Sequence, residues 1–254
     1  MKEQLYTIPL MDAFQEQDEC PFCFIRRSLE QHEMDFVLGS QASYMEDDVR
    51  AKTDEYGFCR DHYHKMFTYG NRLGSALILE THLKRLNKDL KKQLDGYTPG
   101  KSSLLGRFKK PSGDSNSSPL TSWIRRETGK CYICEHMETI YKRYLDTFFE
   151  LFKKDPEFRT LLKNGKGFCL EHFGDLVDGA EKRLNEKEKS ELFKIIFPQM
   201  TENLDRVIED VEWFQKKFDY QFKEADWKNS KDAVQRAMQK AGGGYPADEP
   251  YVSK

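Results

Sequence analysis

The sequence predicts an all-α protein made of two similar helical units, and three observations predict this class. Apolar residues recur at helical spacing over several long stretches. Hydrophobic residues make up only 38% and charged residues 33% of the 254 residues, yet there are 18 Phe and 12 Tyr. This balance is typical of amphipathic helices with solvated outer faces and aromatic inner faces. The third observation is a cysteine and histidine pattern that occurs twice.

The repeated pattern is C-x2-C followed, after a gap of nearly constant length, by G-F-C-x2-H. Residues 20–23 are Cys-Pro-Phe-Cys, and residues 57–62 are Gly-Phe-Cys-Arg-Asp-His. Residues 131–134 are Cys-Tyr-Ile-Cys, and residues 167–172 are Gly-Phe-Cys-Leu-Glu-His. Three thiolates and one imidazole are the ligand set of a closed tetrahedral zinc site. The predicted metal ligands, which include all six cysteines, are Cys20, Cys23, Cys59, His62, Cys131, Cys134, Cys169 and His172.

Three other roles for the cysteines fit the sequence less well. Unliganded core thiols would not be expected in two sets of the same order and spacing. A disulfide framework requires an oxidising compartment, and it would leave both histidines unexplained. A thioredoxin-like redox pair requires a βαβ context, which the sequence does not show.

The first repeat is expected to span residues 1–95. Residues 1–19 are predicted to form an extended arm that turns at Pro9, with a short helix over 12–17. A long helix is predicted from Cys23 to about Met45, then a shorter return helix over 47–56 that Gly57 breaks, and a third helix from Cys59 to about Leu94.

The rest of the chain is expected to repeat this order after a linker. Residues 96–120 are rich in Gly, Pro, Ser and Asn and predict a flexible linker. Residues 121–241 predict the second metal-binding repeat with additional C-terminal helices, in which Pro198 forces a kink or a restart. Residues 242–254, which begin with three glycines, are predicted to be a disordered tail.

Each C-x2-C pair is predicted to share its metal with the G-F-C-x2-H of its own half. The metal would then join two helix N-termini, where unpaired backbone N–H groups and the helix dipole favour thiolates. Cys23 is 36 residues from Cys59 but 146 from Cys169. Loop closure over the longer separation costs roughly 1.2 kcal/mol more, which favours the local pairing.

Four charged residues are predicted to support the metal sites. Arg50 and Arg159 both lie in the first turn of a return helix, and they are expected to pair with helix-end carbonyls or carboxylates. Asp61 and Glu171 directly precede the ligand histidines, so each could accept a hydrogen bond from an imidazole or pair with a neighbouring arginine. Simple exposure at the surface fits both residues equally well.

With these motifs in view, together with DDVR and DPEFR ahead of the third cysteines, the chain resembles an uncharacterised family of bacterial proteins. That family is common in clostridia and their relatives and is defined only as a domain of unknown function. The likeness covers roughly the whole chain up to the glycine run. It implies no established activity and no catalytic residue. It also implies an anaerobic source, which makes iron–sulfur chemistry the alternative to zinc.

The functional expectation is a metal-binding protein with two structural Zn²⁺ ions that acts as a binding or scaffold module. The alternative is an electron carrier or redox enzyme subunit with two Cys3His-ligated iron–sulfur clusters; an enzyme that uses a groove between the halves is a third possibility. The formal net charge of -2 makes nucleic acid a poor partner. No stretch has the length of a membrane span or a signal segment, so a cytoplasmic location is expected.

Overall fold

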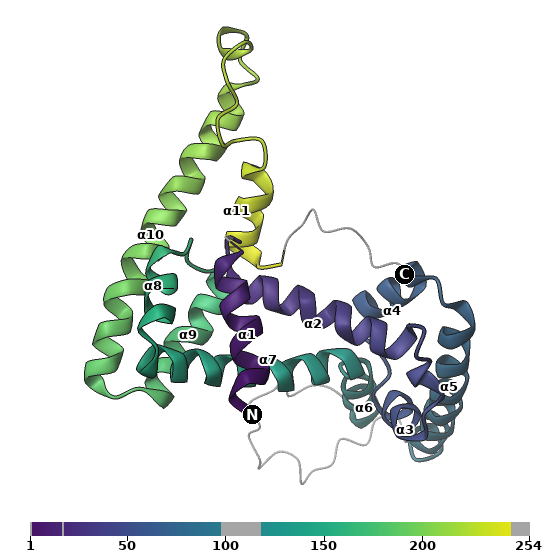
Figure 1. The fold of residues 1–254 in the computed structure, drawn as a ribbon. Helices are drawn as coiled ribbons and strands as arrows, with labels where there is room; N and C mark the ends of the chain where they lie inside the picture. Colours follow the sequence, from purple (N-terminus) through teal and green to yellow (C-terminus); the bar gives the residue numbers. More distant parts are fainter. Residues whose placement is uncertain (1, 17, 98–117, 245–254) are drawn as a thin grey trace. The chain divides into compact units, whose positions relative to one another are not determined.

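The structure is a computed structural model that describes residues 2–16, 18–97 and 118–244, and these ranges contain helices and no strand (Figure 1). The predicted all-α class is therefore confirmed for the part of the chain that is described. The helices in chain order are α1 (Lys2–Gln15), α2 (Pro21–Leu38), η1 (Ser43–Met45), α3 (Asp47–Tyr56), α4 (Arg60–Tyr69), α5 (Arg72–Asp95), α6 (Pro119–Thr128), α7 (Tyr132–Lys154), α8 (Pro156–Asn164), α9 (Leu170–Arg183), α10 (Glu186–Lys216), η3 (Tyr220–Phe222) and α11 (Ala233–Gly242).

The chain divides into two compact units, each drawing on both halves of the sequence. Unit 1 contains the described residues of Met1–Glu30 and Met137–Glu249, and unit 2 those of Gln31–His136. The boundaries fall inside α2 and inside α7, so each of these helices begins in one unit and ends in the other. The compact units therefore differ from the predicted segments 1–95 and 121–241. Most of the predicted linker, 98–117, and the tail from 245 lie outside the described residues.

Unit 1 has an aromatic core to which α1 contributes. Phe14 of α1 packs edge-on against Phe22 at the start of α2 and against Phe158 of α8, with ring centroids 6.2 and 5.0 Å apart. The prediction of an extended arm at the N-terminus was wrong, because α1 runs through Pro9 without ending. Proline removes one backbone hydrogen bond there. The complete burial of Leu10 and Ala13 offsets that loss.

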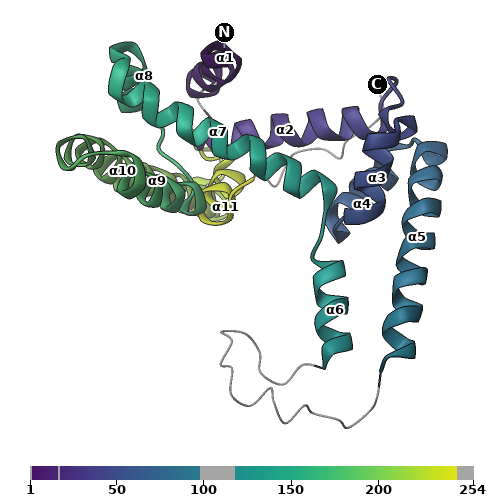
Figure 2. The same ribbon diagram turned by 90° about the horizontal axis from the view of Figure 1, so that it is seen from below.

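Unit 2 is built around α3, which packs against α5, as Figure 2 shows. The predicted helix from Cys59 to Leu94 is interrupted, because α4 ends at Tyr69 and α5 begins at Arg72. Asn71 stabilises the break: its side chain accepts a hydrogen bond from the Gly74 N–H and donates one to the Leu38 carbonyl at the end of α2. A capped turn therefore replaces a continuous helix.

The C-terminal helix α11 packs against α9 and α10 within unit 1, and buried charges hold it there. Lys240 is 2% exposed, and its ammonium donates hydrogen bonds to the carbonyls of Glu19 and Lys166. Arg236, on the preceding turn, pairs with Asp210 of α10 at 2.9 Å. Buried ions are tolerated only when they are paired in this way. Lys240 thus ties α11 to the two segments that directly precede Cys20 and Gly167-Phe168-Cys169.

Candidate metal centres

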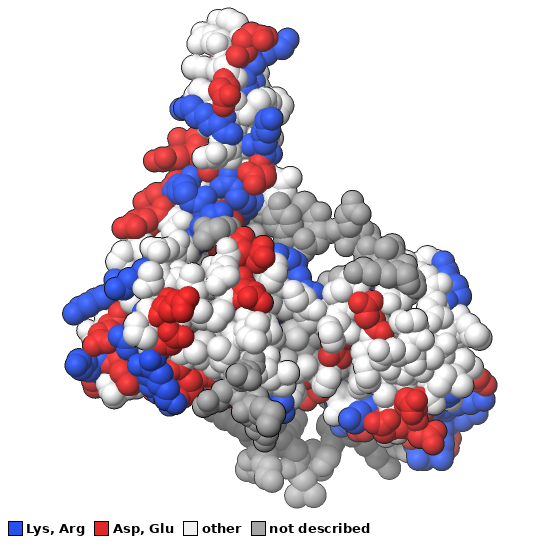
Figure 3. Space-filling view, viewed as in Figure 1, with Lys and Arg blue, Asp and Glu red and all other residues white. Residues whose placement is uncertain are grey.

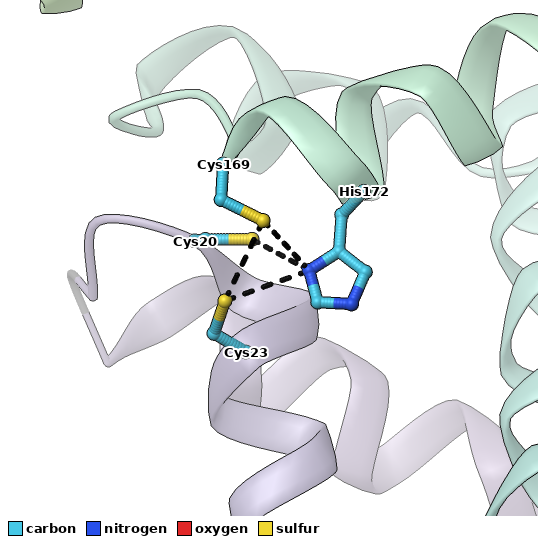
Figure 4. Close-up of side chains that lie close together, drawn as sticks. All are labelled: Cys20, Cys23, Cys169 and His172. Atoms are coloured by element: carbon cyan, nitrogen blue, oxygen red, sulfur yellow. Dashed lines mark hydrogen bonds between the residues drawn. The ribbon is translucent and has the colours of Figure 1, made fainter. Parts of the chain in front are cut away.

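The first group of predicted ligands lies entirely within unit 1 and consists of Cys20, Cys23, Cys169 and His172 (Figure 4). The Nδ1 atom of His172 lies 3.3 Å from Cys20 Sγ, 3.5 Å from Cys23 Sγ and 3.1 Å from Cys169 Sγ. The sulfur atoms of Cys23 and Cys169 are 3.7 Å apart. All four residues are buried. We call this group the unit 1 centre.

The second group lies entirely within unit 2 and consists of Cys59, His62, Cys131 and Cys134. The Nδ1 atom of His62 lies 3.1, 3.3 and 3.4 Å from the sulfur atoms of Cys59, Cys131 and Cys134. The sulfur atoms of Cys59 and Cys134 are 3.9 Å apart. Cys131 and His62 are buried, whereas Cys134 is exposed. We call this group the unit 2 centre.

Both centres are built from the starts of two helices. In unit 1, Cys20 directly precedes α2 and Cys23 lies in its first turn, while Cys169 is the N-cap of α9 and His172 lies in its first turn. In unit 2, Cys131 precedes α7, and Cys59 is the N-cap of α4. Helix N-termini carry free N–H groups and a partial positive charge. The predicted placement of the ligands at helix N-termini is therefore confirmed, and it favours thiolates.

The spacing of the ligand atoms fits one tetrahedral ion in each centre. Metal–sulfur bonds of about 2.3 Å and metal–nitrogen bonds of about 2.0–2.1 Å place two sulfurs about 3.8 Å apart, and a sulfur and a nitrogen about 3.5 Å apart. The observed sulfur–sulfur distances of 3.7 and 3.9 Å lie on either side of the first value. The sulfur–nitrogen distances of 3.1–3.5 Å lie at or slightly below the second. Both groups could thus hold a metal ion.

The predicted pairing within each half was wrong. Cys20 and Cys23 meet Cys169 and His172, not Cys59 and His62, and the second C-x2-C is exchanged in the same way. The reason lies in the helix lengths. The 18 residues of α2 span about 27 Å, whereas the 10 residues of the return helix α3 span about 15 Å. The return helix therefore retraces little more than half of α2, and a loop-closure difference of roughly 1.2 kcal/mol is too small to overcome the packing of unit 1.

Without an ion, the three thiols of the unit 1 centre have very different pKa values. Hydrogen bonds from Cys20 and Cys23 hold the pKa of the Cys169 thiol well below its ordinary value. Burial raises the pKa of Cys20, and the hydrogen bond to Cys169 raises the pKa of Cys23 to about 12. One thiolate is therefore stable in this buried space, and a divalent cation would supply the charge that allows all three to ionise.

In the unit 2 centre, the pKa values of Cys131 and Cys134 also differ strongly. The hydrogen bond from Cys134, followed by that from His62, lowers the pKa of Cys131 to about 3 against the opposing effect of burial. The same contact with Cys131, together with burial, raises the pKa of Cys134. Here too a divalent cation would supply the charge that allows Cys131 and Cys134 to be thiolates together.

The two acidic residues beside the histidines have different surroundings. Glu171 accepts a hydrogen bond from Arg26 of α2 at 3.1 Å, and Arg26 also pairs with Glu138 of α7 at 3.2 Å. Arg26 thus links the two ligand-bearing helices of unit 1, α2 and α9, to α7, which is the arginine contact that was predicted for Glu171. Asp61 is exposed in the first turn of α4 and forms no ion pair with any residue in the described ranges.

The two arginines of the return helices have different surroundings, and neither forms a hydrogen bond with a ligand of either centre in the described part of the chain. Arg159 donates to the carbonyl of Phe152 near the end of α7 and pairs with Glu191 of α10 at 3.2 Å. This is the predicted type of contact, but it lies away from the ligands. Arg50 lies in the first turn of α3, where its charge, after that of Lys84, helps to lower the pKa of Glu80.

Sequence reasoning missed the glycines that follow α11. A Cβ atom built on Gly243 would lie 3.6 Å from Cys169 Sγ and 3.9 Å from Cys23 Sγ, and the backbone of Gly244 forms a hydrogen bond with Cys23. Gly243 has a φ of 74°, a conformation that favours glycine. The prediction of a disordered tail from residue 242 was therefore wrong for Gly243 and Gly244, which lie against the unit 1 centre.

The fold and the two centres define a helical protein with two Cys3His groups, in which no described helix is long and apolar enough to cross a membrane. The chain belongs to a family of unknown function, DUF6062, whose model matches residues 1–248. The resemblance to a family defined only as a domain of unknown function is thereby confirmed. No curated protein matches the chain, and no solved structure does.

Proposed function

We propose that the chain binds two structural Zn²⁺ ions, one in each centre, and that the stapled helical units act as a binding or scaffold module. The observation that carries this proposal is that the four ligand atoms of each centre all lie within 4.8 Å of one another, at spacings suited to a tetrahedral ion. Three thiolates and one imidazole occupy all four coordination positions of such an ion. Without an open coordination position, the ion stabilises the fold and does not activate substrate water.

The close spacing also supports zinc over the iron–sulfur alternative. In a cluster, ligands are attached to different irons, so the outer ligand atoms are held farther apart than around a single ion. A single iron in the same four ligands remains the chemical competitor, since thiolates and imidazole also suit iron. Iron bound in this way would colour the protein, whereas zinc has no redox state and no visible absorption.

A protein partner or small ligand fits the surface better than nucleic acid. On the face that Figure 3 shows, each unit carries both Lys or Arg and Asp or Glu, and the sequence has a formal net charge of -2. Each filled centre adds a further negative charge, because three lost protons outweigh the two charges of the ion. Nucleic-acid binding normally requires a positively charged stripe or patch. We therefore propose a cytoplasmic module that takes a protein or small-ligand partner and binds neither nucleic acid nor a membrane.

The experiment that tests this proposal is metal analysis of protein purified without oxygen, with a visible absorption spectrum of the same sample. We expect two zinc ions per chain and a colourless solution. A brown protein that contains iron and sulfide would support the cluster alternative instead. One metal shared between two chains, or none, would contradict the two-centre model.

A chelator series distinguishes a structural ion from a loosely attached one. Removal of the metal should lower the melting temperature and the helical circular dichroism, because binding free energy is folding free energy at such sites. An unchanged melting temperature after complete metal removal would refute the structural role.

A further inference from the structure

The two centres differ in the accessibility of one corresponding cysteine. Cys23 and Cys134 are both the second cysteine of a C-x2-C and both lie in the first turn of their helix. Cys23 is 1% exposed, whereas Cys134 is exposed to solvent. Cys59, whose sulfur lies 3.9 Å from that of Cys134, is also partly exposed. Two of the three cysteines of the unit 2 centre are thus accessible to solvent, whereas all three cysteines of the unit 1 centre are buried.

The difference has a structural cause, which is the cover that α11 and its glycines form over the unit 1 centre. The backbone of Gly243 lies against Cys23 and Cys169, and Gly244 forms a hydrogen bond with Cys23. Lys240 fixes this cover through its hydrogen bonds to the carbonyls of Glu19 and Lys166. In unit 2, the corresponding cysteine, Cys134, is exposed at the surface of the described part of the chain.

We propose that Cys134 is a modification site: its metal-bound thiolate is a surface nucleophile that reacts with small electrophiles, and its reaction releases the metal of unit 2 while unit 1 keeps its own. The inference rests on the proposed function, since the metal keeps the sulfur in its thiolate form. The sulfur lone pair forms a new S–C bond, the bond from carbon to the leaving group breaks, and the leaving group departs with the electron pair. The product thioether is neutral, so the unit 2 centre loses one anionic ligand.

The test uses the full zinc-loaded chain and iodoacetamide, from which iodide leaves, with zinc release followed by a coloured chelator and modified cysteines identified by peptide mass spectrometry. Metal analysis before the reagent is added establishes that two ions are bound, so a failure of the proposed function is seen first and separately. We expect Cys134 to be modified at least about tenfold faster than Cys23, whose reaction requires local opening of the cover. Zinc should fall from two ions to one per chain in the same phase.

A matched pair of variants tests whether the cover is the cause. Gly243→Val places a branched side chain at a φ of 74° and beside the two sulfurs, and should displace the cover. Gly242→Val is the control, because a Cβ there meets nothing within 4 Å. We expect Gly243→Val to speed modification of Cys23 at least about tenfold, as expected when a closed segment opens, with the rate at Cys134 unchanged in both variants.

Two results would overturn the inference. One is modification of Cys23 or Cys20 as fast as, or faster than, Cys134 in the unaltered zinc-loaded chain. The other is release of both ions in a single phase together with Cys134 modification, which would show that the two centres do not respond separately.

Discussion

Replacing Cys169 with serine should empty the unit 1 centre and leave the unit 2 centre filled. Cys169 is 0% exposed, and its sulfur lies 3.1 Å from His172 Nδ1 and 3.7 Å from Cys23 Sγ. Serine keeps the approximate shape but does not supply a thiolate. At free zinc a thousand times the dissociation constant, the lost ion alone removes about 4 kcal/mol of stability. That is a large share of the roughly 5–15 kcal/mol that stabilises a typical fold.

The matched variant is Cys59→Ser, which should empty the other centre. An iodoacetamide pulse that ends before Cys134 reacts in the zinc-loaded chain, followed by peptide mass spectrometry, shows which cysteines have lost their metal. In Cys169→Ser we expect labelling of Cys20 and Cys23 and protection of Cys131, and in Cys59→Ser the reverse. Both variants should retain one zinc ion per chain by metal analysis. If Cys59→Ser instead exposed Cys20 and Cys23 while Cys131 stayed protected, the exchanged pairing would be refuted.

Three further measurements check other parts of the structure. Gly57→Ala should destabilise unit 2 by more than the roughly 1–3 kcal/mol of backbone strain expected for a side chain at positive φ, because its Cβ would also lie 2.6 Å from His82. Gly167→Ala, whose Cβ has its nearest contact at 3.4 Å, should cost only the backbone strain. Equal losses in melting temperature for the two variants would contradict this. Burial and the hydrogen bond to Asp35 raise the pKa of Tyr69 to about 12. The stability that the protonated Tyr69 contributes should therefore be complete below pH about 10 and be lost as the pH rises towards 12. In unfolding curves measured at alkaline pH, the Tyr69→Phe variant should not show this loss. Metal affinity should fall as the pH falls, because protons compete for the thiolates, and a zinc-release titration that was flat from pH 8 to pH 4 would argue against cysteine ligation.

Local features were predictable from sequence where a few neighbouring residues determine them. The start of α8 is one example: Asp155 accepts hydrogen bonds from the N–H groups of Glu157 and Phe158, and Pro156 occupies the first turn, where it is tolerated. The eight ligand residues were predictable for the same reason, since type and spacing within each motif carry the chemistry.

Features that depend on distant packing were not predictable in this way. Lys240 has the pattern of an ordinary charged residue in an amphipathic helix, and only the fold shows that it is buried against Glu19, 221 positions away. The partner of each C-x2-C depends on where α2 ends relative to the return helix, and the linker composition suggested no fixed arrangement of the two halves. Loop entropy is a small term beside a buried aromatic core.

The exchanged ligand pairs also have a consequence for synthesis of the chain. Neither half of the sequence contains a complete centre. During translation, Cys20 and Cys23 therefore have no complete metal site until His172, 149 residues after Cys23, has been synthesised. At about 5–20 residues per second this delay is roughly 7–30 seconds. The unit 2 centre is complete once Cys134, 75 residues after Cys59, has been synthesised, so its delay is about half that of the unit 1 centre. Metal insertion during translation would fill unit 2 before unit 1, and until then the nascent chain carries free thiols that depend on a reducing environment.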